Sequence, residues 1–356
     1  MSGRSEIIDV AKGLCIILVV FGHNPYMGLP ENEHISMLFS SFRVPLFFFL
    51  AGVFLKESSS LRYFIISRAD SLLKPFFVVL ILLGILKLII ALTTGFIEIP
   101  TIQYFLGVIW GNGVTLSWPP LWFLPHLFLS LIFSLLVLRL SVKLPIVYLI
   151  VIVILLLPVG VYILKFFWFP ATYVHAPVNF NNLPGLPWGL EVTPITSSFI
   201  LSGYLLRDQI MTFSSNFNRF FLSLGVFLIL HHFFDESVDL NMRIYGNFLI
   251  STLQIVLGVY LTLSVAVLIT RHNFGNKIFS YFGSASLFIL IFHSSPQGKL
   301  YKLLSLISDY PLLNGIISFV LVVIFSIVLF EVAKKFGLTR LLFLPVRMSK
   351  KAFPTN

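Results

Sequence analysis

Three residues that can do acid–base chemistry lie on one side of an otherwise apolar stretch, IIDVAKGLCIILVVFGHNP, residues 7–25. At about 100° per residue in an α-helix, Lys12 and His23 are only about 20° out of phase, and Asp9 lies within about 60° of both. A rise of about 1.5 Å per residue separates Lys12 from His23 by roughly 16 Å, about half of a hydrocarbon core. The pattern predicts a membrane helix with one polar face that avoids lipid.

His23 is the strongest catalytic candidate on this face. Its neutral imidazole can take a proton at physiological pH, as a general base must. Asp9 and Lys12 also have a simpler interpretation, because residues at i and i+3 near a helix end can pair with one another.

Five further ionisable residues fall within apolar segments, where charge is costly and by default indicates function. They are Arg43, Lys87, His126, Glu191 and His293. Lys87 lies toward the end of its segment, so its side chain can extend to the interface. His126 and His293 are equally compatible with core histidines whose hydrogen bonds are satisfied.

The whole chain is too apolar for a soluble protein. Of its 356 residues, 58% are hydrophobic and only 11% charged, and the mean hydropathy is +0.98. These values favour a polytopic membrane protein. The single cysteine, Cys15, excludes an intramolecular disulfide and a cysteine-cluster metal site, and we expect no metal.

Ten segments are long and apolar enough to span a bilayer as helices. They centre near residues 7–26, 35–55, 73–95, 120–138, 144–166, 188–206, 218–234, 247–270, 278–295 and 312–333. A shorter apolar run at 101–111 fits an interfacial or re-entrant segment. No repeat or low-complexity linker divides the chain. We therefore predict an all-α membrane bundle in one domain, residues 1–340, with a short basic tail at 341–356.

Lysine and arginine asymmetry orients this bundle. With the N-terminus inside, most basic residues fall in cytoplasmic segments, and the opposite side keeps only Lys165, Arg243, Lys299 and Lys302. An even number of helices then returns the C-terminus to the cytoplasm. The formal charge of +10 is therefore mainly a topology signal, which argues against nucleic-acid binding. The tail could in addition bind anionic membrane lipid.

The first segment and the loop at 166–190 each allow two interpretations. The first segment has no convincing small-residue cleavage site, so we interpret it as a retained helix and not a signal peptide. The outer loop 166–190 is rich in aromatic residues, prolines and asparagines. Such residues can line a carbohydrate groove, but an interfacial aromatic belt is the simpler interpretation.

The first segment resembles the first helix of the integral-membrane acyltransferase family 3, which includes bacterial O-acetyltransferases of surface polysaccharides. That family has a basic residue, ten intervening residues and then a histidine, and Lys12 and His23 match this spacing. FRVPLFFFLAGVFLK (42–56), LWFLPHLF (121–128) and FGSASLFILIFH (282–293) resemble later blocks of the family. The resemblance covers nearly the whole chain.

Two positions depart from the family pattern. Members often carry two arginines spaced three apart at the start of the third helix, implicated in handling acyl-CoA. Arg68 matches the first arginine, Ser71 stands at the second, and Lys74 could supply the missing charge one turn along. Arg43 occupies a place where relatives often have histidine.

The resemblance implies transfer of an acyl group, usually acetyl, from cytoplasmic acetyl-CoA. The acceptor would be a sugar hydroxyl of a surface glycan or its lipid-linked precursor, at the bacterial inner membrane. His23 would act as general base or carry a transient acetyl group, with Asp9 orienting Lys12. The residues that the resemblance implies for binding the CoA phosphates are Lys12, Arg68 and Lys74. The residues that we expect to bind the acceptor are Arg43, Trp122, His126, Glu191 and His293.

Two other functions account for a bundle with intramembrane charges. A secondary transporter or flippase for a small solute or lipid-linked sugar would usually show inverted repeats with paired broken helices, and we see none. A non-catalytic scaffold or sensor would not need the Lys12–His23 spacing. The sequence leaves the sugar, the acyl group and the oligomeric state open.

Overall fold

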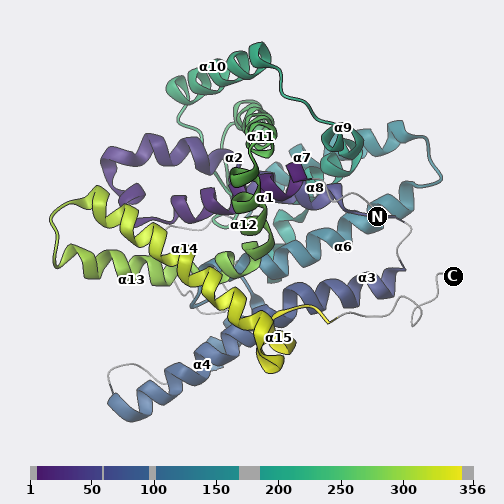
Figure 1. The fold of residues 1–356 in the computed structure, drawn as a ribbon. Coiled ribbons are helices and arrows are strands. Elements are labelled where there is room, and N and C mark those ends of the chain that lie inside the picture. The colour runs from purple at the N-terminus through teal and green to yellow at the C-terminus, as the bar shows by residue number, and fades with distance from the viewer. Residues whose placement is uncertain (1–5, 58–59, 96–101, 168–184, 347–356) are drawn as a thin grey trace. The chain divides into compact units, whose positions relative to one another are not determined.

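The computed structural model describes residues 6–57, 60–95, 102–167 and 185–346, and in these ranges the chain is almost entirely helical (Figure 1). The predicted all-α helical bundle is therefore confirmed. Its helices are α1 (Glu6–Gly22), α2 (Glu33–Val53), α3 (Leu61–Arg68), α4 (Lys74–Thr94), α5 (Ile102–Trp110), α6 (Phe123–Ser141), α7 (Ile146–Leu164), α8 (Thr193–Leu205), α9 (Arg207–Met211), α10 (Phe217–Phe233), α11 (Phe248–Thr270), α12 (Asn273–Phe292), α13 (Ser294–Ser305), α14 (Pro311–Lys335) and α15 (Gly337–Phe343).

Short elements connect these helices. A π-helical turn, η3 (Ala69–Leu73), joins α3 to α4 without a break. The 3₁₀ turns are η1 (Pro25–Gly28), η2 (Pro30–Asn32), η4 (Pro119–Trp122) and η5 (Pro187–Val192). Each begins at a proline, whose fixed φ suits the first position of a helical turn. Two-residue strands β1 (Val238–Asp239) and β2 (Ile244–Tyr245) pair antiparallel.

Seven helical stretches within the described ranges are long and apolar enough to cross a membrane, by length and composition. They coincide with seven of the ten predicted spans and support a multi-pass membrane protein. The other three predicted spans, 7–26, 188–206 and 218–234, correspond to the shorter helices α1, α8 and α10, of 17, 13 and 17 residues. Helix α1 ends before the predicted residue 26 because Pro25 follows it closely. Helix α8 begins later than residue 188 because the backbone at Trp188 and Gly189 is left-handed.

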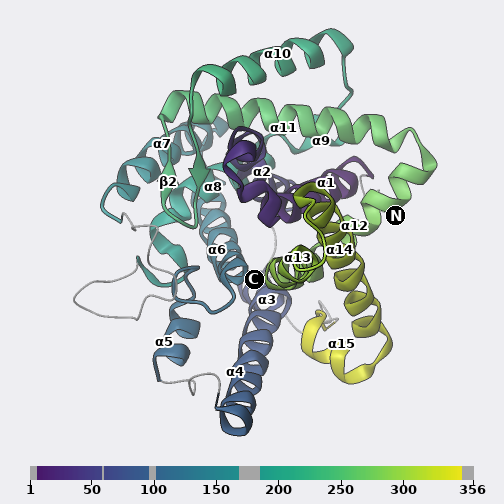
Figure 2. The same cartoon turned by 90° about the vertical axis from the view of Figure 1, so that its left-hand side faces the viewer.

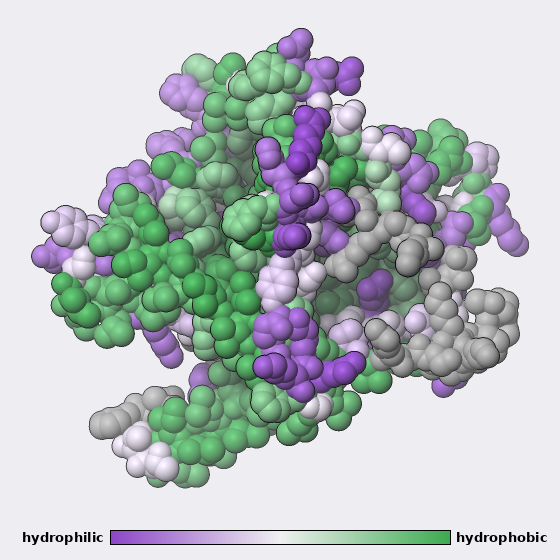
Figure 3. Space-filling view, viewed as in Figure 1, coloured by the Kyte–Doolittle hydropathy of each residue, from purple (hydrophilic) through white to green (hydrophobic). Residues whose placement is uncertain are grey.

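Helix α14 illustrates how the apolar residues are used. Its exposed side carries Leu312, Ile316, Val320, Ile324 and Val328 at intervals of four, while Ser318 and Ser326 on the other side are fully buried. Figure 3 shows the resulting apolar surface over α14, with another over α4. Apolar residues outside and small polar residues inside are typical of a helix that faces lipid.

The chain forms two compact units. The first unit comprises residues 1–54, 199–240 and 244–330, and the second comprises residues 55–198, 241–243 and 331–356. In the first unit α1 packs against α2, α11 and α12, and α10 lies along α11 (Figures 1 and 2). In the second unit α6 packs against α7 and η5.

The domain boundary at residue 340 and the cytoplasmic location of both termini stay predictions. Most of the aromatic outer loop, residues 168–184, and the tail residues 347–356 lie outside the described residues.

Candidate active site

Helices α1 and α12 run side by side in the same direction within the first unit. At one end, the Asn276 amide donates a hydrogen bond to Glu6 at 2.8 Å, and at the other end His23 meets His293. Gly13 allows this close approach, because a Cβ there would overlap the backbone carbonyl of Phe279. A small residue at the crossing therefore sets the register that brings the two histidines together.

His23 has a defined tautomer. Its Nδ1 lies 2.9 Å from the backbone carbonyl oxygen of Val19, one turn earlier. A carbonyl oxygen only accepts hydrogen bonds, so Nδ1 carries the proton and Nε2 keeps a free lone pair. His23 as a residue is exposed. A group outside the protein core can therefore reach this residue and give a proton to Nε2.

His293 is held in the same way but is fully buried. Its Nδ1 lies 2.9 Å from the carbonyl oxygens of Ile289 and Leu290. Its Nε2 is buried without a hydrogen-bond partner among the described residues. The His23 and His293 rings meet edge to face, with centroids 4.9 Å apart.

Arg43 of α2 completes this group of side chains. Its guanidinium packs against Gly22, where any Cβ would overlap it, so it lies directly beside His23. Nη1 is buried without a hydrogen-bond partner in the described part of the chain. The carboxylate of Asp239, in β1, interacts electrostatically with both Arg43 and His23. Sequence reasoning missed Asp239, which lies in the short hairpin between α10 and α11.

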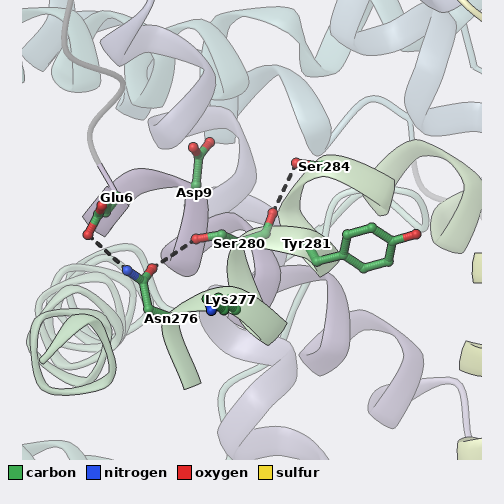
Figure 4. Close-up of a pocket in the computed structure, with 7 residues that line it drawn as sticks. All are labelled: Glu6, Asp9, Asn276, Lys277, Ser280, Tyr281 and Ser284. Atoms are coloured by element: carbon green, nitrogen blue, oxygen red, sulfur yellow. Dashed lines mark hydrogen bonds between the residues drawn. The ribbon is translucent and has the colours of Figure 1, made fainter. Parts of the chain in front are cut away.

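Asp9 and Lys12 lie at the other end of α1. The Lys12 ammonium sits over the Phe54 ring, 4.3 Å from its centroid. Asp9, only 8% exposed, lines a cavity of about 460 Å³ between α1 and α12. Figure 4 shows hydrogen bonds in this cavity linking Glu6 to Asn276 and Asn276 to Ser280. The three residues of the predicted polar face therefore have different surroundings: Asp9 lines the cavity, Lys12 lies over Phe54, and His23 belongs to the histidine group.

Arg68 and Lys74 flank the π turn in the second unit. The Lys74 ammonium lies 2.7 Å from Asp70 Oδ1 and 2.7 Å from the Leu344 carbonyl oxygen. The other Asp70 oxygen accepts from the Val346 amide at 2.6 Å. Arg68 lies over the Phe64 ring, 5.1 Å from its centroid. The positive charge of Lys74 is therefore already balanced by Asp70.

The remaining predicted residues meet in a separate cluster of the second unit. The rings of Trp122 and His126 stack, with centroids 5.5 Å apart. His126 is fully buried, and its nitrogens lie 3.0 Å from the Trp188 carbonyl oxygen and 3.1 Å from the Thr196 hydroxyl. With both nitrogens in use, this geometry is typical of a core histidine.

Glu191 belongs to a buried ion pair next to this cluster. Its Oε1 lies 2.7 Å from Nη2 and 2.8 Å from Nε of Arg243, and both side chains are almost completely inaccessible. The Leu186 amide donates to the other Glu191 oxygen at 3.1 Å. Gly189, with φ of +68°, packs against both His126 and Arg243, so it links the ion pair to the histidine.

Comparison with known proteins agrees with this architecture. A family model described as an acyltransferase domain matches residues 6–331, which include all the predicted site residues. No significant match was found among curated proteins or among solved structures.

Proposed function

This chain belongs to acyltransferase family 3, and on that basis we propose that it moves an acetyl group from cytoplasmic acetyl-CoA to a sugar hydroxyl of a cell-surface glycan. The glycan is an O-antigen, capsule or exopolysaccharide, or its lipid-linked precursor. The location is the bacterial inner membrane. The family and the apolar helices show that the protein is a membrane acyltransferase. The acyl donor, the acceptor and the identity of the membrane are our proposal.

The free lone pair of His23 Nε2 carries the proposal. The acceptor hydroxyl gives its proton to Nε2 while its oxygen attacks the thioester carbonyl carbon. The carbon–sulfur bond then breaks, and the CoA thiolate takes the proton back from the imidazolium. Arg43, beside His23, supplies positive charge for the oxyanion that forms between these two events.

A second route uses the same residues in a different order. Nε2 attacks the thioester carbonyl carbon, the carbon–sulfur bond breaks, and CoA leaves as the thiolate, which leaves an acetyl-imidazolium on His23. The acceptor hydroxyl then attacks the acetyl carbon, its proton passes through solvent to the thiolate, and His23 returns to its neutral form. Rapid denaturation at neutral pH after incubation with labelled acetyl-CoA and no acceptor separates the routes, because only this one places the label on the protein.

In the second unit, Arg68 and Lys74 are the residues that we propose for the CoA phosphates. Arginine and lysine form strong charge-assisted hydrogen bonds to phosphate. Of these two residues, Arg68 is the stronger candidate for phosphate binding, because the Lys74 ammonium is paired with Asp70.

The direct test is transfer of ¹⁴C-acetyl from acetyl-CoA to the glycan fraction of membranes that contain the protein. Label in the glycan that depends on the protein supports the proposal. Protein-dependent uptake or flipping of an unmodified sugar, without label transfer, would instead indicate the transporter alternative.

A further inference from the structure

Two glutamines of the first unit are buried with unused hydrogen-bonding groups. Gln254 of α11 and Gln297 of α13 are both 0% exposed. Neither the amide oxygen nor the amide nitrogen of either residue has a hydrogen-bond partner among the described residues. Because buried polar groups are nearly always paired, two complete carboxamides in this state point to a ligand that pairs with them.

Gln297 is directly connected to the histidine pair. It follows His293 by one helical turn, and its backbone amide donates to the His293 carbonyl at 3.0 Å. His293 in turn contacts the His23 ring and also carries an unpartnered Nε2. The Gln297 carboxamide therefore lies one turn from the ring that touches the proposed base.

Gln254 is on α11, the helix that packs against both α1, which carries His23, and α2, which carries Arg43. One turn further along α11, Gly258 lies so close to the Phe42 ring that a Cβ would overlap it. Phe42 directly precedes Arg43. The hairpin that holds Asp239 leads into the start of α11, so along the chain Gln254 lies between this hairpin and Gly258.

We propose that Gln254 and Gln297, with His293 Nε2 and Arg43 Nη1, form a subsite that binds the neighbouring hydroxyls of a sugar whose reacting hydroxyl lies at His23. A carboxamide both donates and accepts hydrogen bonds, as does each hydroxyl of a sugar ring. The exposed side of His23 is where the reacting hydroxyl enters. This inference rests on the proposed function, and it adds the residues that select a polyhydroxylated acceptor.

The test uses purified protein in liposomes with ¹⁴C-acetyl-CoA. The acceptor probes are octyl glucoside and octyl galactoside, compared with 1-octanol, which has one hydroxyl and no sugar ring. The variants are Gln254→Leu and Gln297→Leu, which keep nearly the same volume. We expect each to raise the KM for the alkyl glycosides at least tenfold, with the KM for acetyl-CoA within twofold and octanol acetylation unchanged.

Ser264→Ala is the matched control. Ser264 is also on α11, fully buried and without a partner for its hydroxyl among the described residues, but it lies nearly three turns beyond Gln254. We expect wild-type kinetics from it. Unchanged glycoside KM values in both glutamine variants would overturn this inference alone. Wild-type protein that transfers label to no acceptor would overturn the proposed function and this inference with it.

Thermal unfolding in detergent separates binding from a structural role. Without acceptor, the leucine variants should have a Tm equal to or above the wild type, because each loses a buried unpaired amide. Octyl glucoside should raise the Tm of the wild type and of Ser264→Ala, but not that of the leucine variants. A lower Tm in both leucine variants without acceptor would show that the fold needs these amides, and would overturn the inference.

Discussion

The imidazole rings of His23 and His293 are edge to face, with their planes at 80° and their centroids 4.9 Å apart. Each ring directs Nδ1 to a carbonyl of the preceding helical turn, which leaves both Nε2 atoms with lone pairs. His293 is buried and His23 exposed. The inner ring thus holds the position of the outer one, which is the ring that can reach a substrate.

Removing the base should abolish the reaction. We expect His23→Ala to lower acetyl transfer by about 10²- to 10⁴-fold, the usual contribution of a general base. Protein level and membrane insertion should not change. The control is His232→Ala, an exposed histidine on α10. Labelled acetate in the glycan fraction is the measurement, and substantial residual transfer by His23→Ala would remove His23 from the mechanism.

The contact between Arg43 and Gly22 can be tested by a substitution that leaves both Arg43 and His23 in place. Gly22→Ala adds one methyl group that overlaps the guanidinium, so Arg43 must move away from His23. We expect kcat to fall at least tenfold, while the Tm changes little because alanine is the better helix former. Gly225→Ala on α10 is the control, since nothing lies within 4 Å of its Cβ. Equal kcat for both variants would mean that Arg43 does not act from this position.

The crossing of α1 and α12 should control stability as well as register. Gly13→Ala places a methyl group on the Phe279 carbonyl, and the two helices must separate. We expect a loss of about 1–3 kcal/mol in the free energy of unfolding, as is usual for overpacking. Denaturation in mixed micelles measures it, again against Gly225→Ala. A stability equal to that of the wild type would show that the crossing adjusts at no cost.

Sequence patterns found the residues of α1 better than their partners. The helical period placed Asp9, Lys12 and His23 on one polar face, and the structure puts Asp9 in a polar cavity and His23 in the histidine group. Nothing in the sequence pairs His23 with His293, because that contact depends on how α1 packs on α12. Helix α13 was missed for a related reason. It is amphipathic and not apolar enough to be recognised as a span.

The polar pairs of the second unit show the same division. Lys74 and Asp70 are four residues apart on one helix, so their pairing is readable from sequence. The hydrogen bond from Lys74 to the Leu344 carbonyl cannot be predicted from sequence in this way, and neither can the ion pair of Glu191 with Arg243. Both join segments that only the tertiary fold brings together.

The Glu191–Arg243 pair predicts a strong and asymmetric effect on stability. Arg243→Met should cost about 3–5 kcal/mol of unfolding free energy, because it leaves the Glu191 carboxylate buried and unpaired. Adding Glu191→Leu should recover most of this loss, since an apolar pair needs no desolvated charge. Unfolding in detergent measures both variants. A double variant as unstable as Arg243→Met would show that packing, and not the unpaired charge, causes the loss.

Arg68 should contribute to donor binding more than Lys74 does. The Lys74 charge is balanced by Asp70, so Lys74→Met removes less net attraction for phosphate than Arg68→Ala. A lost charge-assisted hydrogen bond costs about 1.5–3 kcal/mol, so Arg68→Ala should raise the KM for acetyl-CoA roughly 10- to 100-fold with kcat nearly unchanged. Arg62→Ala, an exposed arginine on the same helix, is the control.

The dependence on ionic strength tests the same assignment independently. If Arg68 binds phosphate, added salt should raise the KM for acetyl-CoA in the wild type and in Arg62→Ala. The increase should be smaller in Arg68→Ala, because salt screens an attraction that this variant has already lost. Equal salt dependence in all three proteins, together with an unchanged KM in Arg68→Ala, would place CoA recognition on other residues.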